Sequence, residues 1–167
     1  MKKTLNLFNR VTCFLALISF ALIFQSCNDK PKEKEQSVPE FNLMTAKAEI
    51  EEANKNFMAL VSAGDSIGLA NAYTKDAKFM SAGAPSVVGR TDIQTAMSNI
   101  IKSGITSVDL RLENVYGTED LIAEEGELTL FVGDAAVAEE KYIVLWKKED
   151  GKWKLFRDIF NSNLSPE

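Results

Sequence analysis

The sequence predicts an α+β fold in which a curved antiparallel sheet wraps around three helices. Apolar residues recur at helical spacing in the first part of the folded region, whereas the last third of the chain alternates with the two-residue period of strands. Short turns separate the four C-terminal extended stretches, so neighbouring strands are expected to run antiparallel. With 167 residues, 46% of them hydrophobic, the chain suffices for one ordinary globular domain and a tail.

The three helices are predicted from apolar spacing and from their end signals. Gly64 ends the first helix, Asp65 caps a second helix that carries Tyr73, and Thr91 opens the third. Between the second and third helices the chain turns extended, and Gly83-Ala84-Pro85 breaks that stretch. The expected elements are helices at about 45–63, 65–73 and 91–101, a short strand at 76–81, and long strands at about 105–116, 121–132, 136–148 and 152–161.

The last two strands form a hairpin whose turn sets the register. Glu149-Asp150-Gly151 is interpreted as a three-residue loop closed by glycine in the left-handed region, which pairs Lys148 with Lys152. Both faces of this hairpin are largely apolar, so a helix, a ligand or another subunit is expected to cover each one. Counting outward pairs Tyr142 with Asp158, Val144 with Phe156 and Glu140 with Phe160 on one face, and leaves Lys141, Ile143, Leu145, Leu155, Arg157 and Ile159 on the other.

The N-terminus is typical of an exported lipoprotein. Basic residues up to Arg10 precede an apolar run of 14 residues, which is too short to span a bilayer and suits a secretory signal. Gln25-Ser26-Cys27 then resembles a bacterial lipoprotein processing site, in which the cysteine takes the lipid and becomes the mature N-terminus. The alternative is cleavage to a soluble secreted protein that keeps Cys27 as a leftover thiol.

The domain organisation follows from this leader. Residues 1–26 are predicted to be a signal peptide, residues 27–42 a flexible tether from lipidated Cys27, and residues 43–167 the folded domain. The expected location is the bacterial cell envelope, with contact to a membrane through the lipid anchor only. Only one cysteine would survive maturation, so no disulfide framework is expected.

Composition excludes several classes of function. Without the leader the chain has 16 basic and 24 acidic residues, a formal charge of −8, and no segment gathers basic residues, so nucleic acid is not an expected partner. The chain contains no histidine, which removes the usual base of hydrolase triads and the usual ligand of zinc sites. No metal and no cofactor are expected, and any proton transfer would use Asp, Glu, Tyr or Lys.

Several short motifs follow one another in a recognisable order and spacing. They are Ala63-Gly64-Asp65, Ala72 to Ala77, Gly89-Arg90 with Ile93, Tyr142 to Trp146, and Asp150-Gly151-Lys152-Trp153 running into Asp158-Ile159-Phe160-Asn161. With the order of elements, they resemble the cone-shaped fold of the nuclear transport factor 2-like superfamily, which includes ketosteroid isomerases and SnoaL-like polyketide cyclases. The resemblance covers residues 45–163, is closest to functionally uncharacterised bacterial SnoaL-like members, and implies a curved antiparallel sheet wrapped around three N-terminal helices.

The resemblance does not carry over the residues of steroid isomerisation. Alignment on Asp76-Ala77 puts Ser81 where the isomerase base would stand, and alignment on Gly64-Asp65 puts Phe57 where the oxyanion-holding tyrosine would stand. Neither side chain is competent for that role. The partnering carboxylic acid would fall at or near Glu140. Steroid-type isomerisation is therefore disfavoured.

The candidate site is the inside of the predicted cone, with Asp158 as the candidate catalytic or hydrogen-bonding acid. Glu124 on the neighbouring strand is expected to converge with Asp158, and an acid held among apolar walls would have a raised pKa. Alternatives remain: Asp158 satisfies structural donors, Glu124 belongs to a solvated edge, and the aromatic residues are core. The ligand-binding candidates are Glu124, Glu140, Tyr142, Trp146, Phe156, Asp158, Phe160 and Asn161.

Three functions stay open at this point. The first is an envelope-anchored domain that binds a small apolar or partly polar molecule. The second is a cofactor-independent cyclase, isomerase or hydratase that uses the pocket carboxylate. The third is a structural dimerisation domain, since the apolar outer face of the last hairpin would suit a homodimer.

Overall fold

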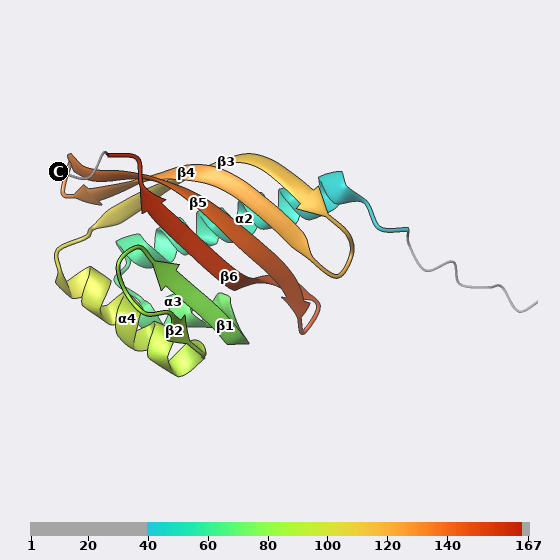
Figure 1. The fold of residues 1–167 in the computed structure, drawn as a ribbon, viewed down its shortest axis with the longest axis horizontal. Coiled ribbons are helices and arrows are strands. Elements are labelled where there is room, and N and C mark those ends of the chain that lie inside the picture. The colour runs from blue at the N-terminus through green and yellow to red at the C-terminus, as the bar shows by residue number, and fades with distance from the viewer. Residues whose placement is uncertain (1–39, 165–167) are drawn as a thin grey trace, which may run out of the picture. The chain divides into compact units, whose positions relative to one another are not determined.

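The computed structural model describes residues 40–164, which form an α+β domain with a curved sheet (Figure 1). The predicted signal peptide and the predicted lipidation site at Cys27 lie outside the described residues. The elements in chain order are α2 (Leu43–Ser62), α3 (Ser66–Asn71), β1 (Tyr73–Ser81), β2 (Val87–Val88), α4 (Arg90–Lys102), β3 (Ser107–Gly117), β4 (Ile122–Val132), β5 (Ala135–Glu149) and β6 (Lys152–Ser162).

The sheet has six strands within residues 40–164, in the order β2-β1-β6-β5-β4-β3. Every neighbouring pair is antiparallel except β1 and β6, which run parallel with Phe79 opposite Asp158. The prediction of an antiparallel sheet is confirmed for the four long strands and was wrong for the β1–β6 pair. The helical crossover between β1 and the long strands permits the parallel arrangement, because parallel strands need a long connection.

The helices cover the inner face of the sheet. In Figure 1, α2 runs behind the long strands, whereas α3 and α4 lie near β1 and β2. Helix α2 packs against β3, and α4 packs against α3 and β1. The hydrophobic core between these layers buries Ile50, Leu69, Ile93, Ile122 and Trp146 almost completely. Because this core is built within residues 40–164, the domain should fold when it is expressed alone.

Most predicted boundaries hold, but the second helix ends earlier, the first strand begins earlier, and the short strand β2 was not predicted. Asp65 caps α3 as expected, since its side chain accepts a hydrogen bond from the backbone N–H of Gly68 at 2.8 Å. The helix then ends at Asn71, and Tyr73 begins a strand instead of closing the helix. Lys154 Nζ donates to the carbonyl of Asn71 at 2.6 Å and so contacts the end of α3. The sequence placed Tyr73 in the helix, whereas the structure places it at the start of β1.

The β5–β6 turn differs from the predicted three-residue loop. Glu149 pairs with Lys152, so the loop is only Asp150-Gly151, and both residues have positive φ, 52° and 74°. This is the geometry of a type I′ turn, for which Asp-Gly is a preferred sequence. A bulge at Phe156 then shifts the register again, so that Val144 lies opposite Asp158 and Tyr142 opposite Phe160.

The outer face of the sheet carries an exposed apolar pair, Ile143 opposite Ile159. The prediction that a second copy of the chain covers this face stays a prediction. Within residues 40–164 no helix has the length and hydropathy required to cross a membrane.

Candidate functional site

A cavity of about 520 Å³ lies between the inner face of the sheet and helices α2 and α4. Its walls are mainly apolar and come from every layer of the domain. Polar groups are few and come mainly from the strands. The apolar side chains include Phe57, Val61, Phe79, Met97, Ile100, Val108, Leu110, Leu128, Leu130 and Phe160, and the polar ones are Asn54, Tyr73, Ser81, Ser103, Glu140, Tyr142 and Asp158.

Asp158 is the acid at the inner wall of this cavity. Its side chain is 7% exposed, and Oδ2 accepts a hydrogen bond from the Tyr73 hydroxyl at 2.6 Å. Burial raises the pKa of Asp158 to about 6, the nearby Glu124 charge adds to this, and the Tyr73 hydrogen bond opposes it. The other oxygen, Oδ1, accepts no hydrogen bond within residues 40–164. Asp158 therefore has a free acceptor beside the cavity.

Tyr73 is held in place from both ends. Its ring is completely buried and meets Phe57 and Phe79 edge-on, with centroids 6.2 and 6.4 Å away. Burial, and then the charge of Asp158, raise the pKa of the Tyr73 hydroxyl well above its usual value. The hydroxyl therefore stays protonated at neutral pH and acts as a hydrogen-bond donor to Asp158.

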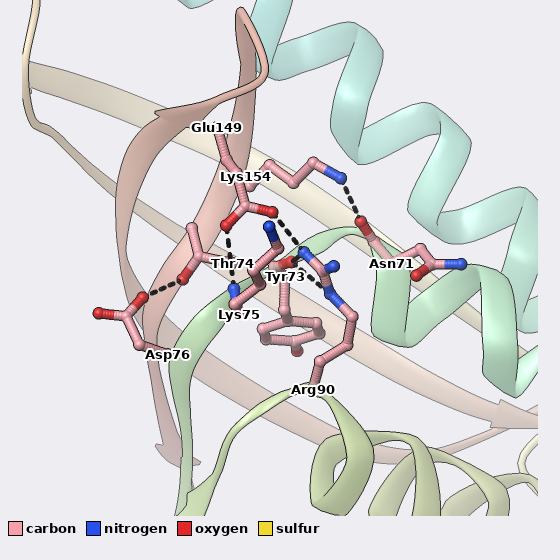
Figure 2. Close-up of polar contacts among 8 residues, drawn as sticks. All are labelled: Asn71, Tyr73, Thr74, Lys75, Asp76, Arg90, Glu149 and Lys154. Atoms are coloured by element: carbon pink, nitrogen blue, oxygen red, sulfur yellow. Dashed lines mark hydrogen bonds and ion pairs between the residues drawn. The ribbon is translucent and has the colours of Figure 1, made fainter.

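The backbone of Tyr73 is clamped by an ion pair at the start of β1 (Figure 2). The Arg90 guanidinium donates to the Tyr73 carbonyl from Nε at 3.1 Å and from Nη2, and Nη2 also pairs with Glu149 at 2.7 Å. The second Glu149 oxygen accepts from the backbone N–H of Lys75 at 3.1 Å. The Arg90 hydrogen bond lowers the pKa of Glu149. Arg90, at the start of α4, thus links the backbone of Tyr73, whose side chain lines the cavity, to Glu149 beside the β5–β6 turn.

Glu124 lies behind the cavity wall and is fully buried, so the alternative of a solvated edge was wrong. Asn54 Nδ2 and the Tyr142 hydroxyl both donate to its Oε1 at 2.7 Å, and Trp146 Nε1 donates to its Oε2 at 2.7 Å. Burial raises the pKa of Glu124, although these three bonds oppose the shift. Glu124 does not line the cavity. Its hydrogen bonds instead orient the side chains of Tyr142 and Asn54, and these two side chains line the cavity.

Gly126 makes room for this arrangement. It lies opposite Tyr142 in the β4–β5 pair, and an added Cβ would come within 2.6 Å of the Tyr142 ring and 2.4 Å of the Arg111 carbonyl oxygen. The close approach requires glycine. Without it, the Tyr142 hydroxyl would be displaced from its hydrogen bond with Glu124.

Glu140 is the second acid that lines the cavity. It lies on β5, two residues before Tyr142 and on the same face. Its Oε2 is buried and has no hydrogen-bond partner within residues 40–164. Burial raises the pKa of this carboxyl.

Tyr142 and Phe160 line the cavity together with Asp158 and Glu140, whereas four predicted residues do not: Glu124, Trp146, Phe156 and Asn161. Phe156 was placed on the inner face, but the bulge turns it outward, where its ring lies 4.6 Å from Lys147 Nζ and 3.6 Å from the Arg157 guanidinium carbon. Leu155 takes the inner position instead and lines the cavity. The shorter turn and the bulge explain both corrections.

Asn161 and Trp146 are the other two corrections. Asn161 is exposed and lies opposite Lys141 on the outer side of the sheet, because the two-residue alternation of β6 points it away from Phe160. Trp146 is buried and donates to Glu124, and it borders a separate pocket that Trp153 also lines. Neither side chain touches the main cavity.

The sequence reasoning missed Tyr73 and Asn54. Asn54 had a usable signal, because it stands between Ile50 and Phe57 on the apolar face of α2, and a polar residue there needs a buried partner. Tyr73 follows a helix and was counted with it. In the described part of the chain, no group of three His, Cys, Asp or Glu side chains is close enough to hold a metal ion.

The cavity has the size and apolar walls to take a small molecule, and it can present that molecule with an acceptor oxygen on an acid of raised pKa. The acceptor is Asp158 Oδ1, and the Tyr73 hydroxyl supports it. An acid with a pKa of about 6 is also suited to proton transfer near neutral pH. Ser81 and Phe57, which the sequence resemblance aligned with the isomerase positions, both line the cavity, and neither side chain can act as that base or as a tyrosine donor.

Comparisons with solved structures agree with this geometry. The chain is similar to a domain of unknown function with a cystatin-like fold from Nostoc punctiforme, at 12% identity and TM-score 0.64 over 72% of this chain and 79% of that one. It is similar to an NTF2-like protein from Novosphingobium aromaticivorans, at 16% identity and TM-score 0.62 over 72% and 84%. A ketosteroid isomerase-like protein from Erwinia carotovora atroseptica matches at 18% identity and TM-score 0.58 over 71% and 96%. At these identities the likeness shows the fold alone.

The sequence comparison is more specific. No curated protein matches the chain. The family model of the SnoaL-like domain matches residues 55–156, which is more than half of the chain and includes the last eight residues of α2, Tyr73, Arg90, Glu124, Glu140 and Tyr142. The resemblance inferred from the residues is thereby confirmed at the level of the family: this protein belongs to the SnoaL-like domain family, with the nuclear transport factor 2-like fold.

Proposed function

We propose that this protein binds a small, mostly apolar molecule in the cavity, with the Asp158–Tyr73 pair as its polar contact. The observation that carries the proposal is the buried Asp158, which keeps one free acceptor oxygen among apolar walls. A cavity of about 520 Å³ lies within the range of small-molecule sites, and a few polar groups among apolar walls are their usual character. The family alone does not fix the ligand.

The proposal is tested with residues 40–167 expressed alone. Native mass spectrometry of the purified domain should show a copurified small molecule, and the neutral probe N-phenyl-1-naphthylamine should become fluorescent in the cavity. Ile100→Trp fills space from α4 and should weaken probe binding by about tenfold or more, because the ring occupies the cavity. Glu139→Gln, at an exposed position on the opposite face of β5, is the matched control.

Equal probe binding by the parent and by Ile100→Trp would contradict the proposal, because it would place the probe elsewhere. No copurified mass together with no probe binding would also contradict it and would favour the structural dimerisation alternative.

A second candidate function is a cofactor-independent cyclase, isomerase or hydratase. The raised pKa of Asp158, about 6, favours it, because a general base works best when its pKa is near the working pH. A bound molecule whose mass or isomer composition changes with time in the parent, but not in Asp158→Asn, would indicate catalysis instead of simple binding.

We also propose that the domain is anchored in the cell envelope through a lipid on Cys27. The support is the basic leader, the apolar run and the Gln25-Ser26-Cys27 sequence. Cys27→Ala should move the protein out of the membrane fraction or leave it unprocessed at higher mass. Cys13→Ala, within the apolar run, is the matched control and should leave the protein in the membrane fraction. Unchanged membrane retention and normal mass of Cys27→Ala would overturn the anchor.

A further inference from the structure

The charged groups that line the cavity are all acidic. Of the 24 residues around it, Glu140 and Asp158 carry carboxyl groups, and no lysine or arginine is among them. Lys141, the lysine next to Glu140 in the chain, points to the outer side, where its Nζ donates to the Ser162 carbonyl at 3.3 Å and to Asn163 at 3.2 Å. The cavity therefore has two acids and no internal counter-charge within the described residues.

Both acids have a carboxyl oxygen without a hydrogen-bond partner. Asp158 is nine-tenths buried and uses only Oδ2, for the Tyr73 bond. The Glu140 side chain lines the cavity and makes no hydrogen bond within residues 40–164, and its Oε2 is buried without a partner. A buried carboxylate oxygen without a partner is costly, because it has lost water and gained nothing. A bound group that donates hydrogen bonds would remove this deficit.

The two acids lie at different ends of the same wall. Asp158, on β6, is opposite Val144 on β5. Glu140 lies four residues before Val144 on β5 and is opposite Ser162. At about 3.3 Å per residue, their backbone positions are separated by about 13 Å along β5. Tyr142 and Leu128 line the surface between them. An elongated molecule can therefore reach one acid with each end while its body lies on apolar side chains.

An anionic ligand fits this cavity poorly. Its charge would be buried beside two acids with no cation to pair with, and like charges in a partly dry site repel strongly. A protonated amine reverses both effects, because it brings hydrogen-bond donors and a charge of the opposite sign to an unpartnered carboxylate.

We propose that the cavity selects an elongated apolar amine, whose ammonium group binds Glu140 and whose other end reaches the Asp158–Tyr73 pair. This inference rests on the proposed binding function and adds the chemical class of the ligand. It assigns Glu140 the role of a specificity residue, and the apolar wall around Leu128 the role of holding the hydrocarbon body.

A matched series of ligands tests the proposal. 4-Phenylbutylamine, 4-phenylbutan-1-ol and 4-phenylbutanoic acid differ only in the end group, and each is titrated against the probe-loaded domain at neutral pH. The amine should displace N-phenyl-1-naphthylamine at about tenfold lower concentration than the alcohol, and the acid should be the weakest. In Glu140→Gln, the concentrations at which the amine and the alcohol displace the probe should differ by about twofold or less. Glu139→Gln should keep the parent's preference for the amine.

The outcomes separate this inference from the proposed function. If the probe binds but the amine and alcohol displace it equally, or the acid displaces it best, amine selection is overturned and small-molecule binding stands. If neither the probe nor any of the three compounds binds, both proposals fail. The parent's preference is diagnostic even if Glu140→Gln does not fold, and an unchanged preference in a folded Glu140→Gln overturns the role of that residue.

Discussion

Asp158→Asn is expected to make the isolated domain more stable above neutral pH, by about 1–3 kcal/mol in the free energy of unfolding. Burial raises the pKa of this carboxyl from 3.8 to about 6, so ionisation of the folded protein is opposed by its surroundings. Asparagine has nearly the same shape and can still accept the Tyr73 hydrogen bond, but it carries no charge to bury.

The raised pKa of Asp158 determines the pH range in which the variant is more stable than the parent. Because the folded carboxyl holds its proton to higher pH than the unfolded one, the folded state binds more protons between about pH 4 and pH 6. The contribution of Asp158 to stability is therefore fully present below its ordinary pKa of 3.8, and it is lost as the pH rises through about 6. The parent and the variant should differ little at about pH 4 and should diverge up to about pH 7.

Urea denaturation across this pH range measures the effect. Glu139→Gln removes an exposed carboxyl on the other face of the sheet and should follow the parent at every pH. A variant that is less stable than the parent at alkaline pH would contradict the prediction, because the carboxylate would then be the form that the fold stabilises.

Asp158→Asn should also bind the ligand more weakly than the parent, although the variant is more stable. A side chain that destabilises the empty protein and improves ligand binding is typical of a functional site, where stability is given up for activity. A purely structural acid would behave in the opposite way, since its removal leaves buried donors without partners. Stability and binding measured on Asp158→Asn therefore distinguish the two interpretations of this residue.

The inward orientation of Asp158 was predictable even though its neighbours were not. Taking the turn as three residues predicted Tyr142 opposite Asp158, whereas the two-residue turn and the bulge at Phe156 put Val144 there. The register error is two residues, and side chains repeat their face every two residues, so the face was preserved. Near the turn, before the bulge, the error is one residue, which is why Leu155 and Phe156 exchanged faces.

The hydrogen bonds of the site could not be predicted from the sequence. Tyr73 and Asp158 are 85 residues apart, and Asn54 and Glu124 are 70 apart. Local periodicity shows which face a side chain takes, but the side chain it meets depends on how the helices pack on the curved sheet. The fold class followed from local patterns, whereas the partners of Glu124 required the packed structure.

Glu124→Ala should destabilise the domain severely, by about 3–5 kcal/mol in the free energy of unfolding, because three buried donors lose their acceptor. Asn54, Tyr142 and Trp146 each donate to this carboxylate at 2.7 Å, and Glu124 itself is fully buried. Glu125→Ala is the matched control on the next residue. Its carboxylate accepts from Asn114 and Tyr116 at the exposed surface, so its loss should cost about 0.5 kcal/mol or less.

Glu124→Gln separates the hydrogen bonds from the space that the side chain fills. The amide oxygen can replace Oε1, which accepts from Asn54 and Tyr142, but the amide NH₂ then faces the Trp146 N–H, donor against donor. A smaller loss of about 1–3 kcal/mol is expected, and Trp146→Phe should remove most of the difference between Glu and Gln. Urea denaturation of the single and double variants gives the coupling energy. A coupling near zero, or a loss below about 1 kcal/mol for Glu124→Ala, would mean that water replaces the carboxylate and that the three bonds do not hold the cavity wall.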